Sequence, residues 1–160
     1  MYKRLYMTTP EGLGSRLRQL IATLDGDVQQ LYDALGVPFR PRFFPIFRGL
    51  FDASPRTVGD LAREIGVSQP AATQTLAEMV KAGLVTLSPG EDRRARQVAL
   101  TPEGQRLAER LRPVWAAICA AAAELDRELP HPLSDLIDQT LAALNRRPFR
   151  ERIERVMRDD

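Results

Sequence analysis

The change from helical to strand periodicity near the middle of the chain is the feature that most constrains its fold. Thr57 is a helix N-cap residue, and Asp60 stands three positions later, which is typical of the first turn of a short helix. That helix closes at Gly66, and Ser68 begins a second helix that ends at Gly83. Two helices joined by a tight turn that carries a glycine predict a helix-turn-helix.

A hairpin follows directly after the second helix. Residues 84–87 and 96–100 are expected to be short strands, and the polar residues 88–95 between them are expected to form a loop. Three arginines stand within four positions at its tip: Arg93, Arg94 and Arg96. Exposed arginines contribute little to stability, whereas an arginine in a narrow minor groove gains from the negative potential there. The hairpin is therefore predicted to be a wing, and the alternative is a soluble tip with local ion pairs.

The second helix carries polar side chains on one face and at its amino-terminal end: Ser68, Gln69, Pro70, Thr73 and Gln74. Glutamine pairs with adenine through two hydrogen bonds, threonine and proline contact thymine methyl groups, and a serine at a helix start helps to hold a phosphate. Helix 68–82 is therefore a candidate recognition helix for the major groove. Taken alone, this pattern fits a solvated polar face equally well.

The rest of the chain is predicted to be helical. Residues 15–35 repeat apolar side chains at alternating steps of four and three, which indicates a seam for packing against another helix. Residues 40–51 are apolar and aromatic. Helices are also expected at 102–129, with a kink at Pro113, and at 133–144, before a short charged tail. The predicted fold class is therefore mostly α with a small β-wing.

Three short motifs lie between Thr57 and Leu107: GLV at the end of the second helix, D-x-R in the hairpin and LT-x-x-G after it. With them, this stretch resembles the MarR family of bacterial transcriptional regulators. The resemblance implies a winged helix-turn-helix with amino- and carboxy-terminal dimerisation helices. It also implies that Asp92 and Arg94 are the D-x-R pair of the wing, with Arg94 as the minor-groove residue.

The resemblance further implies a homodimer, with two winged helices on successive major grooves of a pseudo-palindromic operator in double-stranded DNA. Residues 1–53 would form an amino-terminal dimerisation part, 54–105 the DNA-binding region and 106–160 the carboxy-terminal dimerisation helices, all in one intertwined domain. The apolar faces of 15–35 and 133–144 favour a dimer independently, because one small lobe does not need so much apolar surface. Half-sites are then expected ~10 bp apart. The alternative is that these helices pack on their own subunit's core.

Members of the family often respond to phenolic or other small amphipathic ligands. Phe43, Phe44 and Phe47 are candidates for lining such an effector pocket, since aromatic side chains suit that ligand class. The alternative, which the frequency of buried phenylalanine favours, is that they belong to the core. Cys119 raises the idea of a redox sensor, but a free cysteine among alanines on a helix is more often inert packing.

Composition excludes several other classes of protein. One cysteine and one histidine cannot supply a disulfide framework or a tetrahedral zinc site of Cys and His ligands. No apolar run is long enough for a membrane span, and the first residues lack the apolar region of a signal peptide, so a cytoplasmic protein is expected. We find no nucleotide-binding loop and no nucleophile–base arrangement, and therefore predict no cofactor, no metal and no enzymatic activity.

The charges of the chain matter by position and not by their sum. The formal net charge is only +2, and residues 54–112 are no more basic in total than residues 1–53. The three arginines of the hairpin are nevertheless concentrated at one projecting tip. The sequence therefore predicts a sequence-specific DNA-binding regulator, a repressor, with helix 68–82 in the major groove and wing 88–96 in the minor groove. The alternative is a winged-helix protein–protein interaction module without specific DNA contact, in which Arg94→Ala would change nothing in DNA binding.

Overall fold

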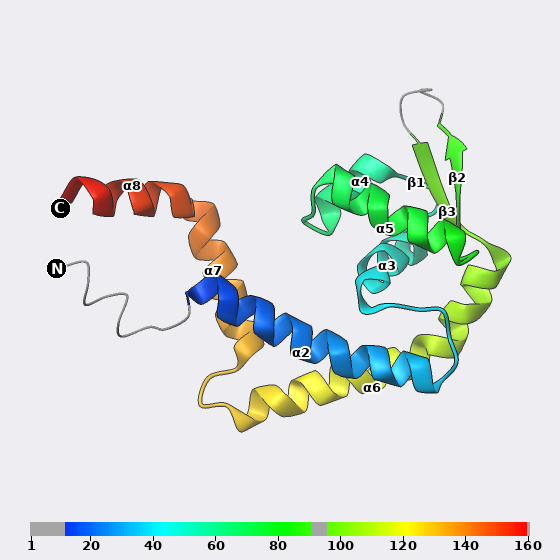
Figure 1. Cartoon of the computed structure of the whole chain (residues 1–160), viewed down its shortest axis with the longest axis horizontal. Coiled ribbons are helices and arrows are strands. Elements are labelled where there is room, and N and C mark those ends of the chain that lie inside the picture. The colour runs from blue at the N-terminus through cyan, green and yellow to red at the C-terminus, as the bar shows by residue number, and fades with distance from the viewer. Residues whose placement is uncertain (1–11, 91–95, 160) are drawn as a thin grey trace. The chain divides into compact units, whose positions relative to one another are not determined.

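The structure, a computed structural model, describes residues 12–90 and 96–159. The chain forms two compact units that divide between Leu111 and Arg112 (Figure 1). The helices are α2 (Leu13–Ala34), the 3-10 helix η1 (Pro41–Phe43), α3 (Phe44–Asp52), α4 (Val58–Glu64), α5 (Gln69–Lys81), α6 (Pro102–Glu128), α7 (Leu133–Arg146) and α8 (Phe149–Asp159). The strands are β1 (Arg56–Thr57), β2 (Val85–Pro89) and β3 (Arg96–Leu100).

The predicted helix-turn-helix is confirmed as α4 and α5. The Oγ1 of Thr57 caps α4 by accepting a hydrogen bond from the backbone N–H of Asp60 at 3.1 Å. The turn passes through Gly66, whose φ of 71° lies in the left-handed region that glycine adopts without strain. Ser68 then caps α5 through a hydrogen bond from the N–H of Ala71. The short polar and glycine signals of the sequence therefore correspond to real helix ends.

The hairpin belongs to a three-stranded antiparallel sheet with the order β1-β3-β2. Strand β2 continues to Pro89, which pairs with Arg96, so the first strand begins one residue later and ends two residues later than the predicted 84–87. Strand β1 is not among the predicted elements; it has only two residues and pairs with Val98 and Gln97 of β3. Two residues are too few to show a strand periodicity, and β1 exists because β3 offers it a free edge.

The core of the first unit is apolar and aromatic. Phe39 lies at its centre, with ring centroids 5.1 Å from Tyr32, 5.7 Å from Phe43 and 5.0 Å from Phe47, all edge to face. Aromatic pairs prefer this geometry because the positive edge of one ring meets the negative face of the other. Other fully buried side chains come from α3, α4, α5, α6 and the sheet: Ile46, Leu50, Leu61, Leu76, Met79, Leu84, Val85, Val98 and Leu111. Helix α5 packs against β2, and Figure 1 shows the helix beside the strands.

The start of α6 is locked onto the end of α5. The hydroxyl of Thr101 donates to the carbonyl of Gly83 at 2.6 Å and accepts from the N–H of Gly104 at 2.9 Å. A Cβ at Gly104 would lie 2.1 Å from the carbonyl oxygen of Leu84, so only glycine allows this close approach. The LT-x-x-G motif therefore joins the carboxyl end of the second helix to the next helix.

Helix α6 runs unbroken through Pro113, so this proline does not end the helix. The boundary between the two units falls two residues earlier, after Leu111. A bend at Pro113 stays a prediction, as does the functional division of the chain at residues 53 and 105.

The second unit has well-defined helix ends but no buried residue among its described residues, 112–159. The carboxylate of Asp126 caps α7 by accepting hydrogen bonds from the N–H groups of Leu133 (2.8 Å) and Ser134 (3.2 Å) and from the Ser134 hydroxyl. Arg152 caps the other end by donating to the carbonyls of Ala143 (2.9 Å) and Arg147 (3.1 Å). The charged tail after residue 148 is itself helical, as α8.

Candidate nucleic-acid interface

Helix α5 has one buried face and a broad polar one. Ala72, Leu76 and Met79 are buried against the rest of the first unit. All five of the residues predicted on the candidate recognition helix are exposed: Ser68, Gln69, Pro70, Thr73 and Gln74. The structure therefore leaves every one of these side chains accessible to a partner.

The amino-terminal end of α5 is organised by its own polar groups. The Ser68 oxygen accepts from the N–H of Ala71, which leaves the hydroxyl hydrogen of Ser68 available to donate. The hydroxyl of Thr73 donates to the carbonyl of Gln69 at 2.9 Å. The amide of the Gln69 side chain forms no hydrogen bond among those found in the described part of the chain. Gln69 is thus suited to present donors and acceptors outward.

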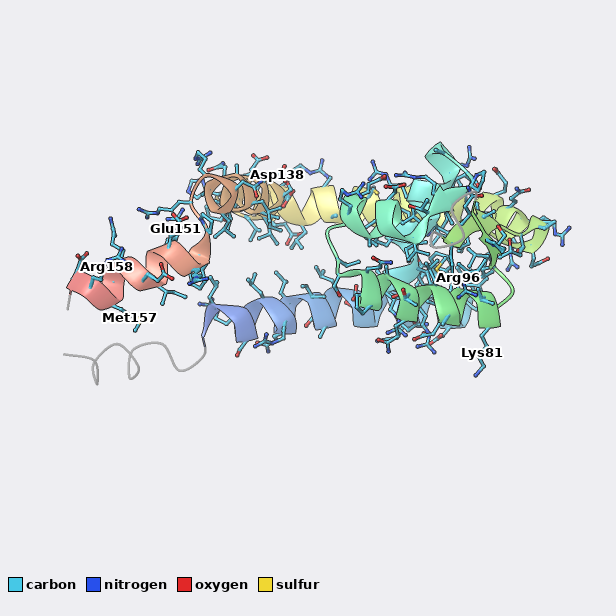
Figure 2. All side chains as sticks on the ribbon, turned by 90° about the horizontal axis from the view of Figure 1, so that it is seen from above. Lys81, Arg96, Asp138, Glu151, Met157 and Arg158 are labelled. Atoms are coloured by element: carbon cyan, nitrogen blue, oxygen red, sulfur yellow. The ribbon has the colours of Figure 1, made fainter. Side chains whose placement is uncertain are left out.

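One hollow brings the helix and the wing together. It has a volume of about 250 Å³, and its lining includes Gln69 and Thr73 of α5, Leu87 of β2 and Arg96 of β3. Thr57 and Gly59 at the start of α4 complete its other side. Three of the predicted site residues thus lie around a single concave surface although 27 positions separate the first from the last in sequence. Figure 2 labels Arg96 beside α5.

The rest of the predicted wing tip cannot be placed in the same way. Arg93 and Arg94, with Asp92 of the D-x-R pair, lie outside the described residues. Arg96 is exposed at the first position of β3, opposite Pro89. Arg96 itself lines the same hollow as Gln69 and Thr73 of α5.

The other flank of α5 carries an ion-pair cluster that the sequence analysis did not identify. Arg42 donates through Nη2 to Oε2 of Glu78, and Nη1 of Arg40 lies 3.5 Å from the same oxygen. Both arginines flank Pro41 at the start of η1, whereas Glu78 belongs to α5. No sequence signal joins residues 36 positions apart, because the contact depends on how the chain turns between α2 and α3.

Helix α4 is held by a polar network at its first turn. The Thr57 hydroxyl donates to the carboxylate of Asp60 at 2.7 Å, and Arg63 donates to the same carboxylate at 2.8 Å. These two hydrogen bonds stabilise the ionised form and lower the pKa of Asp60 below its ordinary value. The network fixes the helix that precedes the turn into α5.

The aromatic residues of the predicted effector pocket differ in their burial. Phe43 and Phe47 are fully buried and pack on Phe39, while Phe44 is only half-buried. This packing is that of a hydrophobic core, and a ligand at these residues stays a prediction. Cys119 is exposed on α6 in the single chain.

Two further features follow from the described residues. They contain no group of three or more histidine, cysteine, aspartate or glutamate side chains that could hold a metal ion. Within the same residues, no helix is both long enough and apolar enough to span a membrane.

The comparison with protein families identifies the central segment. The model of the MarR family matches residues 49–95, which run from α3 through α4 and α5 into the wing. Over this segment, called the MarR segment below, the chain is similar to the MarR family, and its structure there is a winged helix. The five predicted site residues from Ser68 to Gln74 fall within the MarR segment, whereas Arg96 and helices α2, α6, α7 and α8 lie outside it. No curated protein matches the sequence.

Solved structures of MarR-type regulators share the fold of the chain at low sequence identity. The DNA complex of the transcriptional regulator MosR from M. tuberculosis aligns with a TM-score of 0.68 and 22% identity, covering 86% of this chain and 99% of that one. A MarR variant from E. coli in complex with operator DNA gives 0.65 and 20%, covering 87% and 96%. The transcriptional regulator BldR from Sulfolobus solfataricus gives 0.59 and 21%, covering 91% and 96%. These alignments extend the shared fold well beyond the MarR segment.

Proposed function

We propose that this chain is a DNA-binding transcriptional regulator that places helix 68–82 in the major groove and wing 88–96 in the minor groove. The observation that carries the proposal is the hollow at which Gln69 and Thr73 of α5 meet Arg96 of the wing. The MosR and MarR structures with the same fold are complexes with DNA, which supports the same use of this surface.

The dimensions and the chemistry of α5 fit a major groove. An α-helix with its side chains is about 10–12 Å wide, and the major groove is about 12 Å wide. The exposed Gln69 and Gln74 carry amide groups that match the donor and acceptor pattern of adenine. Thr73 adds a methyl group for contact with thymine, and Ser68 and the helix start face a phosphate.

The proposal includes a homodimer, because much apolar surface is uncovered in the single chain. Five of the large apolar side chains of the α2 seam are 40–57% exposed: Leu17, Ile21, Leu24, Leu31 and Leu35. No described residue of the second unit is buried, although α7 and α8 both carry large apolar side chains. Burying such side chains is worth about 1.5–3 kcal/mol each, so a partner surface is required. We assign that surface to a second copy, which would give an operator with half-sites ~10 bp apart.

Repression is the regulatory role that we propose, with the protein acting in the cytoplasm where the DNA is. A dimer bound across an operator within a promoter blocks the approach of the polymerase by its bulk. Release by a small amphipathic effector at Phe43, Phe44 and Phe47 is part of the same proposal. It requires the aromatic cluster to open, because Phe43 and Phe47 are buried.

The test is the selection of bound DNA from a random pool, repeated at several salt concentrations. We expect a palindromic consensus, and an affinity that falls steeply with salt as phosphate contacts release counterions. Thr73→Ala together with Arg96→Gln should lose the consensus. Gln105→Ala, a change of an exposed polar residue on α6, is the control that should keep it. A chain that selects no sequence, or that binds DNA equally well after the double change, would instead be a protein–protein interaction module.

A further inference from the structure

The basic cluster on the flank of α5 away from the wing has a geometry that the proposed function does not use. Arg40 and Arg42 both reach the same oxygen of Glu78, yet their side chains are 57% and 47% exposed. The side chain of Glu78 is less exposed, at 32%. The guanidinium groups therefore lie over the carboxylate and extend beyond it into solvent.

Glu78 lies on the side of the exposed face of α5 opposite the wing, and the cluster lies there with it. Successive residues of an α-helix are about 100° apart, so Glu78 lies about 140° around the axis from Thr73. Thr73 lines the hollow beside the wing, whereas Glu78 lines a separate hollow beside η1. Gln74 and Lys81 lie between these two positions, on the outermost stripe of α5. The wing and the Arg40–Arg42 pair therefore border opposite sides of the same exposed face.

The charges of this flank do not cancel. One carboxylate, Glu78, is shared by Arg40 and Arg42, and Lys81 lines the same hollow as Arg40 and Glu78. Asp33 also lines the hollow and accepts a hydrogen bond from the neutral amide of Gln29 at 2.8 Å, so three cations of this flank stand against two carboxylates. Figure 2 shows Lys81 projecting outward from the carboxyl end of α5. Exposed ion pairs contribute little to stability, so stability alone does not account for two arginines on one acid.

A helix in the major groove has a phosphate strand on each side. We propose that Arg40, Arg42 and Lys81 form a phosphate-binding cluster for the strand that the wing does not reach. Glu78 pairs with the two arginines in the absence of DNA, and its carboxylate competes with phosphate for them. The planar guanidinium group donates two parallel hydrogen bonds to a phosphate. When DNA binds, each arginine would therefore exchange the carboxylate of Glu78 for a phosphate. This inference rests on the proposed function, whose surface it extends.

The test measures DNA affinity against salt concentration for the double variant Arg40→Gln, Arg42→Gln. The probes are the sequence selected from the random pool and a mixed-sequence duplex, because phosphate contacts act on both. Each lost contact lowers the slope of log K against log salt by about 0.9, and the proposed dimer carries two clusters, so the double variant should lose nearly 4 from the slope. Its affinity should fall ~1,000-fold at about 0.15 M salt by the same relation. Lys81→Gln should lower the slope by about half as much.

Two further variants separate phosphate binding from a structural role. Glu78→Gln removes the negative charge and should bind DNA at least as tightly as the parent protein, whereas a structural clamp would lose affinity. Arg106→Gln is the matched control, since Arg106 is an exposed arginine that pairs with Glu103 on α6 and lines neither hollow beside α5. Its slope should equal that of the parent, and thermal unfolding of every variant confirms that the fold is kept.

The inference is wrong if the double variant retains the parent's slope, or if Glu78→Gln weakens binding as much as the double variant does. Arg40→Gln alone provides the same test with the direct Arg42–Glu78 contact kept. If the parent protein binds neither probe, the proposed function itself fails. If the parent protein binds both DNA probes and the cluster variants bind them with the same affinity and salt slope, the proposed function stands and this inference is wrong.

Discussion

Gln69 is one of the exposed side chains to which the proposed function assigns a base contact. It is exposed at the first position of α5, and its backbone carbonyl already accepts from Thr73, an interaction that does not involve the side chain. We expect Gln69→Ala to reduce discrimination at one base pair in each half-site by about 1–3 kcal/mol. Affinity for mixed-sequence DNA should change little, because the residue carries no charge.

Competition binding with operators altered one base pair at a time measures this effect. Gln105→Ala provides the same chemical change on α6 and should leave the whole specificity profile as it is. A uniform loss of affinity across all operators would show that Gln69 supports the helix and does not read a base.

Gly104 is the residue at which the backbone itself leaves no room for a side chain. A Cβ there would meet the Leu84 carbonyl oxygen at 2.1 Å, and backbone atoms cannot move aside as the end of a flexible side chain does. We expect Gly104→Ala to lower the free energy of unfolding by about 3 kcal/mol, as overpacking does in well-packed interiors. Urea unfolding measures the loss.

Gly26→Ala is the control for this prediction. Gly26 lies inside α2 with no heavy atom within 4 Å of an added Cβ, so the change should raise stability by about 0.5–1 kcal/mol. The two substitutions are chemically identical and should have opposite signs. Equal effects would contradict the close approach of α6 to the end of α5.

At the scale of elements, local signals predicted more than long-range contacts did. Thr57, Gly66 and Ser68 marked the ends of α4 and α5 because a cap and a left-handed turn depend on a few adjacent residues. Strand β1 was missed, as were the pairs that join distant residues, such as Arg42 with Glu78. These interactions depend on how elements pack, which no short segment of sequence encodes.

The cap of helix α7 is another contact between separate elements that was not predicted from the sequence. Its dependence on pH can be tested. Its cap is the carboxylate of Asp126 from the preceding helix, and hydrogen bonds from the Ser134 hydroxyl and from the backbone N–H groups of Ser134 and Leu133 lower the pKa of Asp126. A lowered pKa means that the ionised carboxylate stabilises the folded state above the ordinary value of 3.8, and that this contribution is lost as the pH falls through the folded pKa. We therefore expect the first turn of α7 to loosen below about pH 4.

NMR shifts of the Leu133 and Ser134 amides follow this change. In Asp126→Asn the cap is neutral at every pH, so the first turn should be looser at neutral pH and should respond little to further acidification. Asp138→Asn, a change of an exposed carboxylate within the same helix, should keep the pH response of the parent protein. A response that persists in Asp126→Asn would assign the effect to another acid.

At the scale of the whole molecule, the main question is what covers the apolar seam of α2. Ile21 is 57% exposed in the single chain, and it lies near the middle of the seam that we assign to the dimer. Ile21→Glu would place a charge in an interface without a partner, and desolvating such a charge costs several kcal/mol. We expect this variant to be monomeric by sedimentation at micromolar concentration.

The same variant should bind a palindromic operator no better than a single half-site, because each winged helix then binds alone. Gln30→Glu introduces the same charge on the side of α2 away from the seam, where the residue is exposed, and should remain dimeric with full operator affinity. A dimeric Ile21→Glu protein would show that the seam packs elsewhere. If the parent protein is monomeric and still binds the operator, the dimer is wrong, but the proposed contacts of α5 with DNA are not contradicted.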